Sequence, residues 1–121
     1  MTREKFTELL KQLQDEELRL NQTKGEEYAG SEDVLSNFKR ISGALQSRGL
    51  NVPPEVVCLV YLQKHLDAIY SYVANGGKAL SEPIGGRIAD ARLYLALLYA
   101  LLLEKEGEEN VHITRWEKSE P

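Results

Sequence analysis

Hydrophobic residues recur every three or four positions along most of this chain, a spacing that is typical of amphipathic helices. The first predicted helix runs from about Thr2 to Thr23, with one apolar stripe and charged residues on its other side. That stripe contains Phe6, Leu9, Leu10, Leu13 and Leu20. We expect Lys24-Gly25 to interrupt the helix. A second helix is predicted between an N-cap at Ser31 and a stop at Gly49, since glycine accepts a left-handed backbone at little cost.

Two further predicted helices are much more apolar. The third is opened by Pro53-Pro54, because proline is tolerated in a first helical turn, and it ends at about Ala74 before Asn75-Gly76-Gly77. A loop over residues 78–86 is expected to lead into the fourth helix, which begins near Arg87 and ends at Gly107. The pattern therefore predicts an all-α, four-helix bundle-like domain over residues 1–109. A short extended C-terminal tail is predicted over residues 110–121.

The third and fourth helices are apolar on nearly every face, which is hard to reconcile with a single four-helix domain. In such a domain each helix keeps at least one face toward solvent. We expect a homo-oligomer in which these two helices supply the interface. The alternative is that the C-terminal tail folds back over the exposed face.

Length, composition and charge narrow the class of protein. The chain has 121 residues, which suits one domain, and its 42% hydrophobic and 28% charged residues are ordinary globular values. A net charge of −4 argues against a binder of long nucleic acids, but leaves room for a local basic pocket. The longest apolar run, Leu93 to Leu103, is too short to cross a membrane. A single cysteine, Cys58, and a charged N-terminus favour a cytoplasmic protein.

Two basic-x-x-Asp motifs interrupt the apolar helices, Lys64 with Asp67 and Arg87 with Asp90. Residues three positions apart lie on the same face of a helix, so each motif places a cation beside a carboxylate. A charge in apolar surroundings needs a partner. The motifs therefore mark either an ion-pair network that joins the two helices or a pocket for an anion.

Other polar and aromatic residues could converge on the same end of an antiparallel bundle. Rings suit a nucleobase, and cations suit phosphate oxygens. The additional candidate ligand residues are Tyr28, Asn37, Phe38, Lys39 and Arg40. His65 is expected to be a packed side chain. It lies about 10 Å along the helix axis from Cys58, too far for a nucleophile–base pair.

The segment GRIADARLYLALLYALL resembles the last core helix of MazG-like, all-α nucleotide pyrophosphohydrolases. The chain is also similar to uncharacterised phage proteins related to the nucleotide-modification-associated and MazG-like families. That resemblance rests on KGEEYAGSEDVLSNFKR, LVYLQKHLDAI and SEPIGGRIADARLYLALLYAL, and covers roughly two-thirds of the chain. It implies a helical nucleotide-sized cleft.

The chain differs from the MazG-like enzymes at two positions of this pattern. MazG-like enzymes hold magnesium with Glu-x-x-Glu and Glu-x-x-Asp pairs, whereas here Lys64 and Arg87 occupy the first positions. Replacing two anions by two cations changes the site by about four charge units and opposes metal binding. We therefore expect a phage-type protein that sequesters a nucleotide-derived immune signal, cyclic or linear, in the cytoplasm of an infected bacterium, without a cofactor or hydrolysis. The alternatives are a magnesium-dependent nucleoside-triphosphate pyrophosphohydrolase and a non-catalytic helical protein-interaction module.

Overall fold

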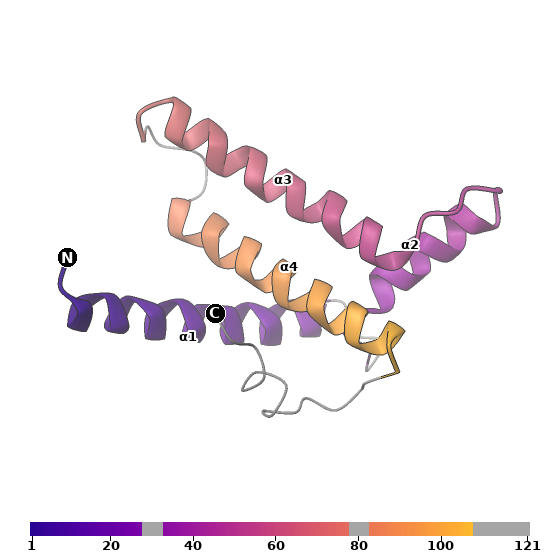
Figure 1. The fold of residues 1–121 in the computed structure, drawn as a ribbon, viewed down its shortest axis with the longest axis horizontal. Coiled ribbons are helices and arrows are strands. Elements are labelled where there is room, and N and C mark those ends of the chain that lie inside the picture. The colour runs from indigo at the N-terminus through magenta and orange to yellow at the C-terminus, as the bar shows by residue number, and fades with distance from the viewer. Residues whose placement is uncertain (28–32, 78–82, 108–121) are drawn as a thin grey trace.

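A computed structural model of the chain describes residues 1–27, 33–77 and 83–107, and within them every regular element is a helix (Figure 1). The helices are α1 (Arg3–Glu27), α2 (Ser36–Gln46), α3 (Pro54–Ala74) and α4 (Ile84–Lys105). The prediction of an all-α domain is confirmed. The predicted tail over residues 110–121, Tyr28 and Ser31 lie outside the described residues.

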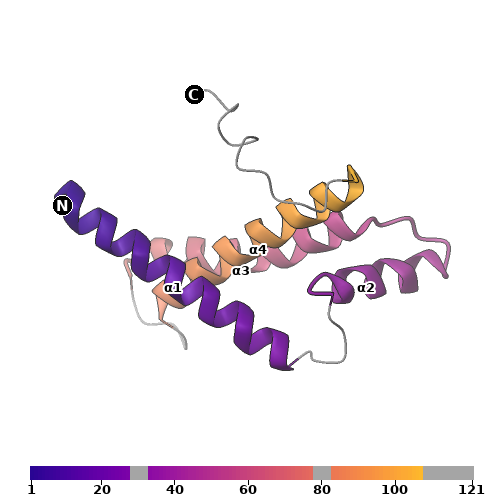
Figure 2. The ribbon, with the colours of Figure 1, turned by 90° about the horizontal axis from the view of Figure 1, so that it is seen from below.

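An antiparallel pair, α3 with α4, forms the centre of the fold (Figure 1). Helix α1 packs on α4 and crosses it, while α2 packs on α3 (Figure 2). Within the described ranges, the backbone of α1 contacts neither α2 nor α3. The four helices are thus arranged as a hairpin with one helix added to each member, which leaves part of the hairpin surface uncovered.

Three predicted helix boundaries are wrong, namely the end of α1 and the starts of α2 and α4. Helix α1 continues through Lys24-Gly25 to Glu27, because one glycine in a helix interior costs only about 1 kcal/mol and does not stop it. Helix α4 begins at Ile84 rather than near Arg87, directly after Pro83. The extended backbone of Pro83 sets the first turn, and Gly85 and Gly86 belong to that turn instead of the loop.

The other predicted ends are confirmed. Gly49 follows α2 with φ +80°, and the amide of Leu50 donates to the carbonyl of Leu45 at 3.0 Å, as in a Schellman motif. Helix α3 begins at Pro54 and ends at Ala74. Gly107 adopts φ +79° after α4. The start of α2 differs from the prediction of an N-cap at Ser31, because the helix begins at Ser36 after a turn in which the Asp33 carboxylate accepts from the amide of Leu35 at 2.9 Å.

The core is small and lies where α2 meets the α3–α4 pair. Its buried members are Leu35, Phe38, Val57, Cys58 and Leu101. Helix α4 has further buried residues outside this cluster, namely Ala89, Ala91, Leu93 and Leu103. Among residues 3–23 of α1, the half-buried side chains are Leu13, Glu16, Glu17 and Leu20. No described helix is long and apolar enough to cross a membrane.

Candidate functional site

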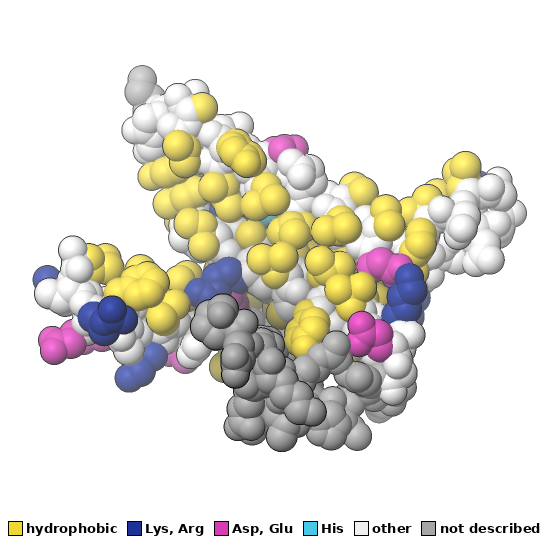
Figure 3. All heavy atoms as spheres, in the orientation of Figure 1, with side chains coloured by type: hydrophobic (Ala, Val, Ile, Leu, Met, Phe, Trp, Pro, Cys, Tyr) yellow, Lys and Arg dark blue, Asp and Glu magenta, His cyan; other side chains and the backbone are white. Residues whose placement is uncertain are grey.

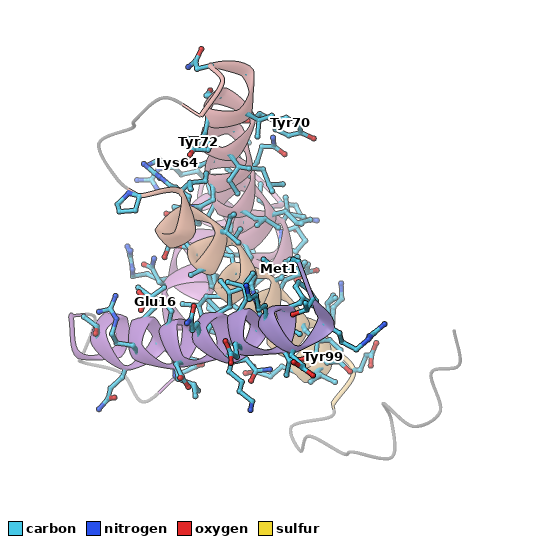
Figure 4. All side chains as sticks on the ribbon, turned by 90° about the vertical axis from the view of Figure 1, so that its left-hand side faces the viewer. Met1, Glu16, Lys64, Tyr70, Tyr72 and Tyr99 are labelled. Atoms are coloured by element: carbon cyan, nitrogen blue, oxygen red, sulfur yellow. The ribbon has the colours of Figure 1, made fainter. Side chains whose placement is uncertain are left out.

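The Lys64–Asp67 motif belongs to α3, where Figure 4 labels Lys64. Both side chains are exposed, and Oδ1 of Asp67 accepts a hydrogen bond at 2.7 Å from Nε2 of Gln63, one turn earlier. Within the part of the chain that the structure describes, no ion pair involves Lys64. This motif is therefore not an internal ion-pair lock, and the Lys64 ammonium faces solvent.

The Arg87–Asp90 motif lies in the first two turns of α4, and both side chains are half-buried. Oδ2 of Asp90 lies 4.0 Å from Nδ1 of His65 on α3, and the two side chains are only 16% and 13% exposed. The His65 ring also packs on Tyr94, with ring centroids 5.0 Å apart. His65 is thus a packed side chain, as predicted, and its approach to Asp90 brings α3 and α4 together at this point.

The predicted ligand residues of α2 are engaged within the fold. The Lys39 ammonium donates to Asp33 at 2.5 Å and to Glu104 at 2.8 Å, which connects α2 to α4. The hydrogen bond from Lys39, and then that from the Leu35 amide, lowers the pKa of Asp33, while Asp33 and Glu104 raise the pKa of Lys39. These are partly exposed pairs, so each contributes at most about 1 kcal/mol.

Asn37, Phe38 and Arg40 also interact with other residues of the fold. Nη2 of Arg40 donates to Oδ1 of Asn37 at 2.7 Å. Phe38 is only 5% exposed and belongs to the core cluster. A ligand could stack on the Phe38 ring only if α2 moved away from the helix pair.

A hollow of about 340 Å³ adjoins Lys39. Its walls are formed by Lys39, Pro53, Pro54, Glu55, Leu101, Glu104 and Lys105. Lys105 is paired with Glu55 at 2.8 Å, which lowers the pKa of Glu55. Two lysines and two glutamates cancel in charge, so this hollow does not attract a polyanion.

The predicted ligand residues that the structure describes, which are all but Tyr28, do not meet in one place. Lys39 is bonded to Glu104 near the end of α4, whereas Arg87 lies in the first turn. Seventeen residues separate Glu104 from Arg87 along this helix, or roughly 25 Å at ~1.5 Å per residue. Lys39 and Arg40 therefore belong to one region and Arg87 and Asp90 to another.

An aromatic cluster is the main feature that the sequence reasoning missed. Phe38 lies 6.0 Å from Tyr61 and 6.2 Å from Tyr94, measured between ring centroids, and Tyr61 stacks with Tyr94 at 6.2 Å. With His65, these rings join α2, α3 and α4. The four-residue spacing of Tyr61 and His65 is a sequence signal for one shared helix face. The contacts to Phe38 and Tyr94 have no local signal.

Ion pairs between helices were missed as well. Arg92 of α4 pairs with Glu17 of α1, and Lys105 pairs with Glu55. Across the described ranges, no group of three or more His, Cys, Asp or Glu side chains could hold a metal ion. Compared with protein-family models, curated proteins and solved structures, the chain matches none. The geometry defines an all-α protein, and the resemblance to MazG-like and phage families stays a prediction.

Proposed function

We propose that this protein binds a small nucleotide-derived anion, cyclic or linear, without hydrolysing it. The role that follows is that of a phage protein that sequesters a nucleotide signal of bacterial immunity in the host cytoplasm. The observation that carries the proposal is the Lys64 ammonium. It is exposed on α3 and has no ion-pair partner within the described residues, although Asp67 lies one turn away.

Arg87 supplies the second cation. It lies in the first turn of α4, where the helix dipole favours an anion. Gly85 and Gly86 precede it, and a Cβ at either position would meet no atom of the described residues within 4 Å. Guanidinium and ammonium groups are the usual partners of phosphate oxygens.

Charge also supports binding over hydrolysis. Where the resemblance expects carboxylates for magnesium, this chain has Lys64 and Arg87. Cations at these positions repel a divalent metal and attract the phosphates themselves. Lys39 and Phe38 are held within the fold, so among the predicted ligand residues the exposed Lys64 carries the proposal.

Isothermal titration of the full chain with linear and cyclic nucleotides, without magnesium, tests the proposal. We expect at least one ligand to bind with a dissociation constant of about 10 μM or lower. Lys64→Glu should weaken it at least about tenfold, as expected for reversing a charge that contacts phosphate. Lys11→Glu, at an exposed lysine of α1, is the matched control and should leave binding unchanged. Binding no tighter than about millimolar to every nucleotide rejects the proposal.

One assay distinguishes the enzyme alternative from a purely sequestering role. Release of pyrophosphate from nucleoside triphosphates in the presence of magnesium would select the pyrophosphohydrolase and reject a purely sequestering role. If the protein neither binds nor hydrolyses nucleotides, the third candidate remains, a helical protein-interaction module. The apolar residues that α3 and α4 expose favour that candidate specifically.

A further inference from the structure

Helix α3 exposes an apolar stripe that no part of the described structure covers. Its residues follow alternating steps of three and four: Val56, Leu59, Gln63, Leu66, Tyr70 and Val73. Tyr70 and Val73 are 72% and 70% exposed, and Leu59 is 47% exposed. Gln63 is the one polar member. Such a repeat of 3.5 residues is the spacing of helices that pack side by side in coiled coils and bundles.

Helix α4 carries a second stripe with the same spacing. Its members are Ile84, Ile88, Ala91, Leu95, Leu98 and Leu102. Leu95 is 53% exposed, while Ile88 and Leu102 are 38% and 39% exposed. Neither stripe contains a charged residue. Ala91 is the one member of this stripe that is already buried within the chain, at 7% exposed.

Both stripes belong to one side of the helix pair. Figure 3 shows hydrophobic side chains gathered over α3 and α4 on the face toward the viewer. Helix α2 lies on the opposite side of the pair (Figure 2), where Phe38 packs between Tyr61 and Tyr94. We call the twelve residues of the two stripes the α3–α4 face.

We propose that the α3–α4 face packs against the α3–α4 face of a second copy of this chain, so that two helix hairpins form a four-helix bundle. A surface of this kind complements itself, because it is apolar, uncharged and built from two antiparallel helices with the spacing that bundles require. The bundle predicted from the sequence is then completed between chains rather than within one.

The exposed area is sufficient for a stable pair. The exposed fractions of the large apolar residues of the α3–α4 face correspond to roughly 650 Å² per copy, or about 1,300 Å² in a symmetric dimer, within the range of specific interfaces. Gln63 lies near the middle of the α3 stripe. A single polar residue at such a position selects one register between packed helices, since other registers leave it facing apolar side chains.

This inference does not depend on nucleotide binding, and it is tested by sedimentation velocity of the full chain. The wild-type protein should sediment as a species of about 27 kDa, twice the 13.7 kDa of one chain. Leu95→Glu should sediment as the single chain with unchanged helical circular dichroism, because Leu95 is half-exposed and outside the core. Tyr70→Lys provides a second variant on α3 with the same expected result.

Leu18→Glu is the matched control. Leu18 is 69% exposed on α1, outside its Phe6–Leu20 stripe, and this substitution should leave the dimer intact. A wild-type protein that is monomeric at about 100 μM, well above the dissociation constants of specific dimers, overturns the proposal. So does a Leu95→Glu or Tyr70→Lys variant that stays dimeric. If the wild-type protein is monomeric but the Trp116→Ser variant forms a dimer, the α3–α4 face is covered by the chain's own C-terminal segment instead.

Discussion

Phe38 connects α2 to the helix pair, and its truncation tests whether this ring belongs to the core or to a ligand site. The side chain is 5% exposed and contacts the rings of Tyr61 and Tyr94. Phe38→Ala removes both ring contacts and leaves a cavity among Leu35, Val57 and the two tyrosines. Phe38→Leu keeps most of the apolar volume, but loses the aromatic contacts.

The magnitude follows from the burial. Truncation of a buried phenylalanine to alanine lowers the free energy of unfolding by about 3–5 kcal/mol. The two aromatic contacts account for about 0.5–1.5 kcal/mol each beyond simple burial. We expect a loss of about 4 kcal/mol for Phe38→Ala and about 1 kcal/mol for Phe38→Leu. The total free energy of unfolding of a domain of this size is about 5–15 kcal/mol, so the alanine variant should be only marginally folded.

Urea unfolding followed by far-ultraviolet circular dichroism measures both values. All proteins are compared at one concentration, because association of the chain would add to the apparent stability. A loss below about 1 kcal/mol for Phe38→Ala would show that the ring is not packed as described. Phe38→Leu should also bind nucleotides as the wild type does. Loss of binding in a fully stable Phe38→Leu protein would return this ring to the ligand site.

Three further predictions concern single features. Because the pKa of Asp33 is lowered from 3.8 in the folded protein, chiefly by Lys39, its stabilisation is present above pH 3.8 and is lost as the pH falls through the lowered value. The free energy of unfolding should therefore fall less steeply with decreasing pH in the Asp33→Asn variant than in the wild-type protein. Gly49→Ala should destabilise by about 1 kcal/mol, since φ is +80° there, whereas Gly43→Ala inside α2 should stabilise by up to about 1 kcal/mol in the same urea assay. Burial raises the pKa of the Cys58 thiol to about 11, so a disulfide reagent at pH 8 should react with it only after unfolding, and rapid reaction of the native protein would contradict its burial.

The candidate site shows where sequence reasoning stops. The spacing of Lys64 and Asp67 correctly places both residues on one helix. It does not predict their partners, since the Asp67 carboxylate accepts a hydrogen bond from Gln63. The same limit applies to Lys39, whose partner Glu104 lies 65 positions away. Spacing within a helix defines which residues share a face, whereas a contact between helices depends on how the faces meet.

The sequence by itself determined the helices and most of their ends, because periodicity, proline and glycine act within a few residues of one another. It also indicated that α3 and α4 are apolar on nearly every face. Only the tertiary structure decided which part of that surface is covered. Packing of α2 through Phe38 buries one side of the helix pair and leaves the α3–α4 face exposed. Packing also gave the two basic-x-x-Asp motifs different surroundings, since Asp90 meets His65 while Lys64 stays in solvent.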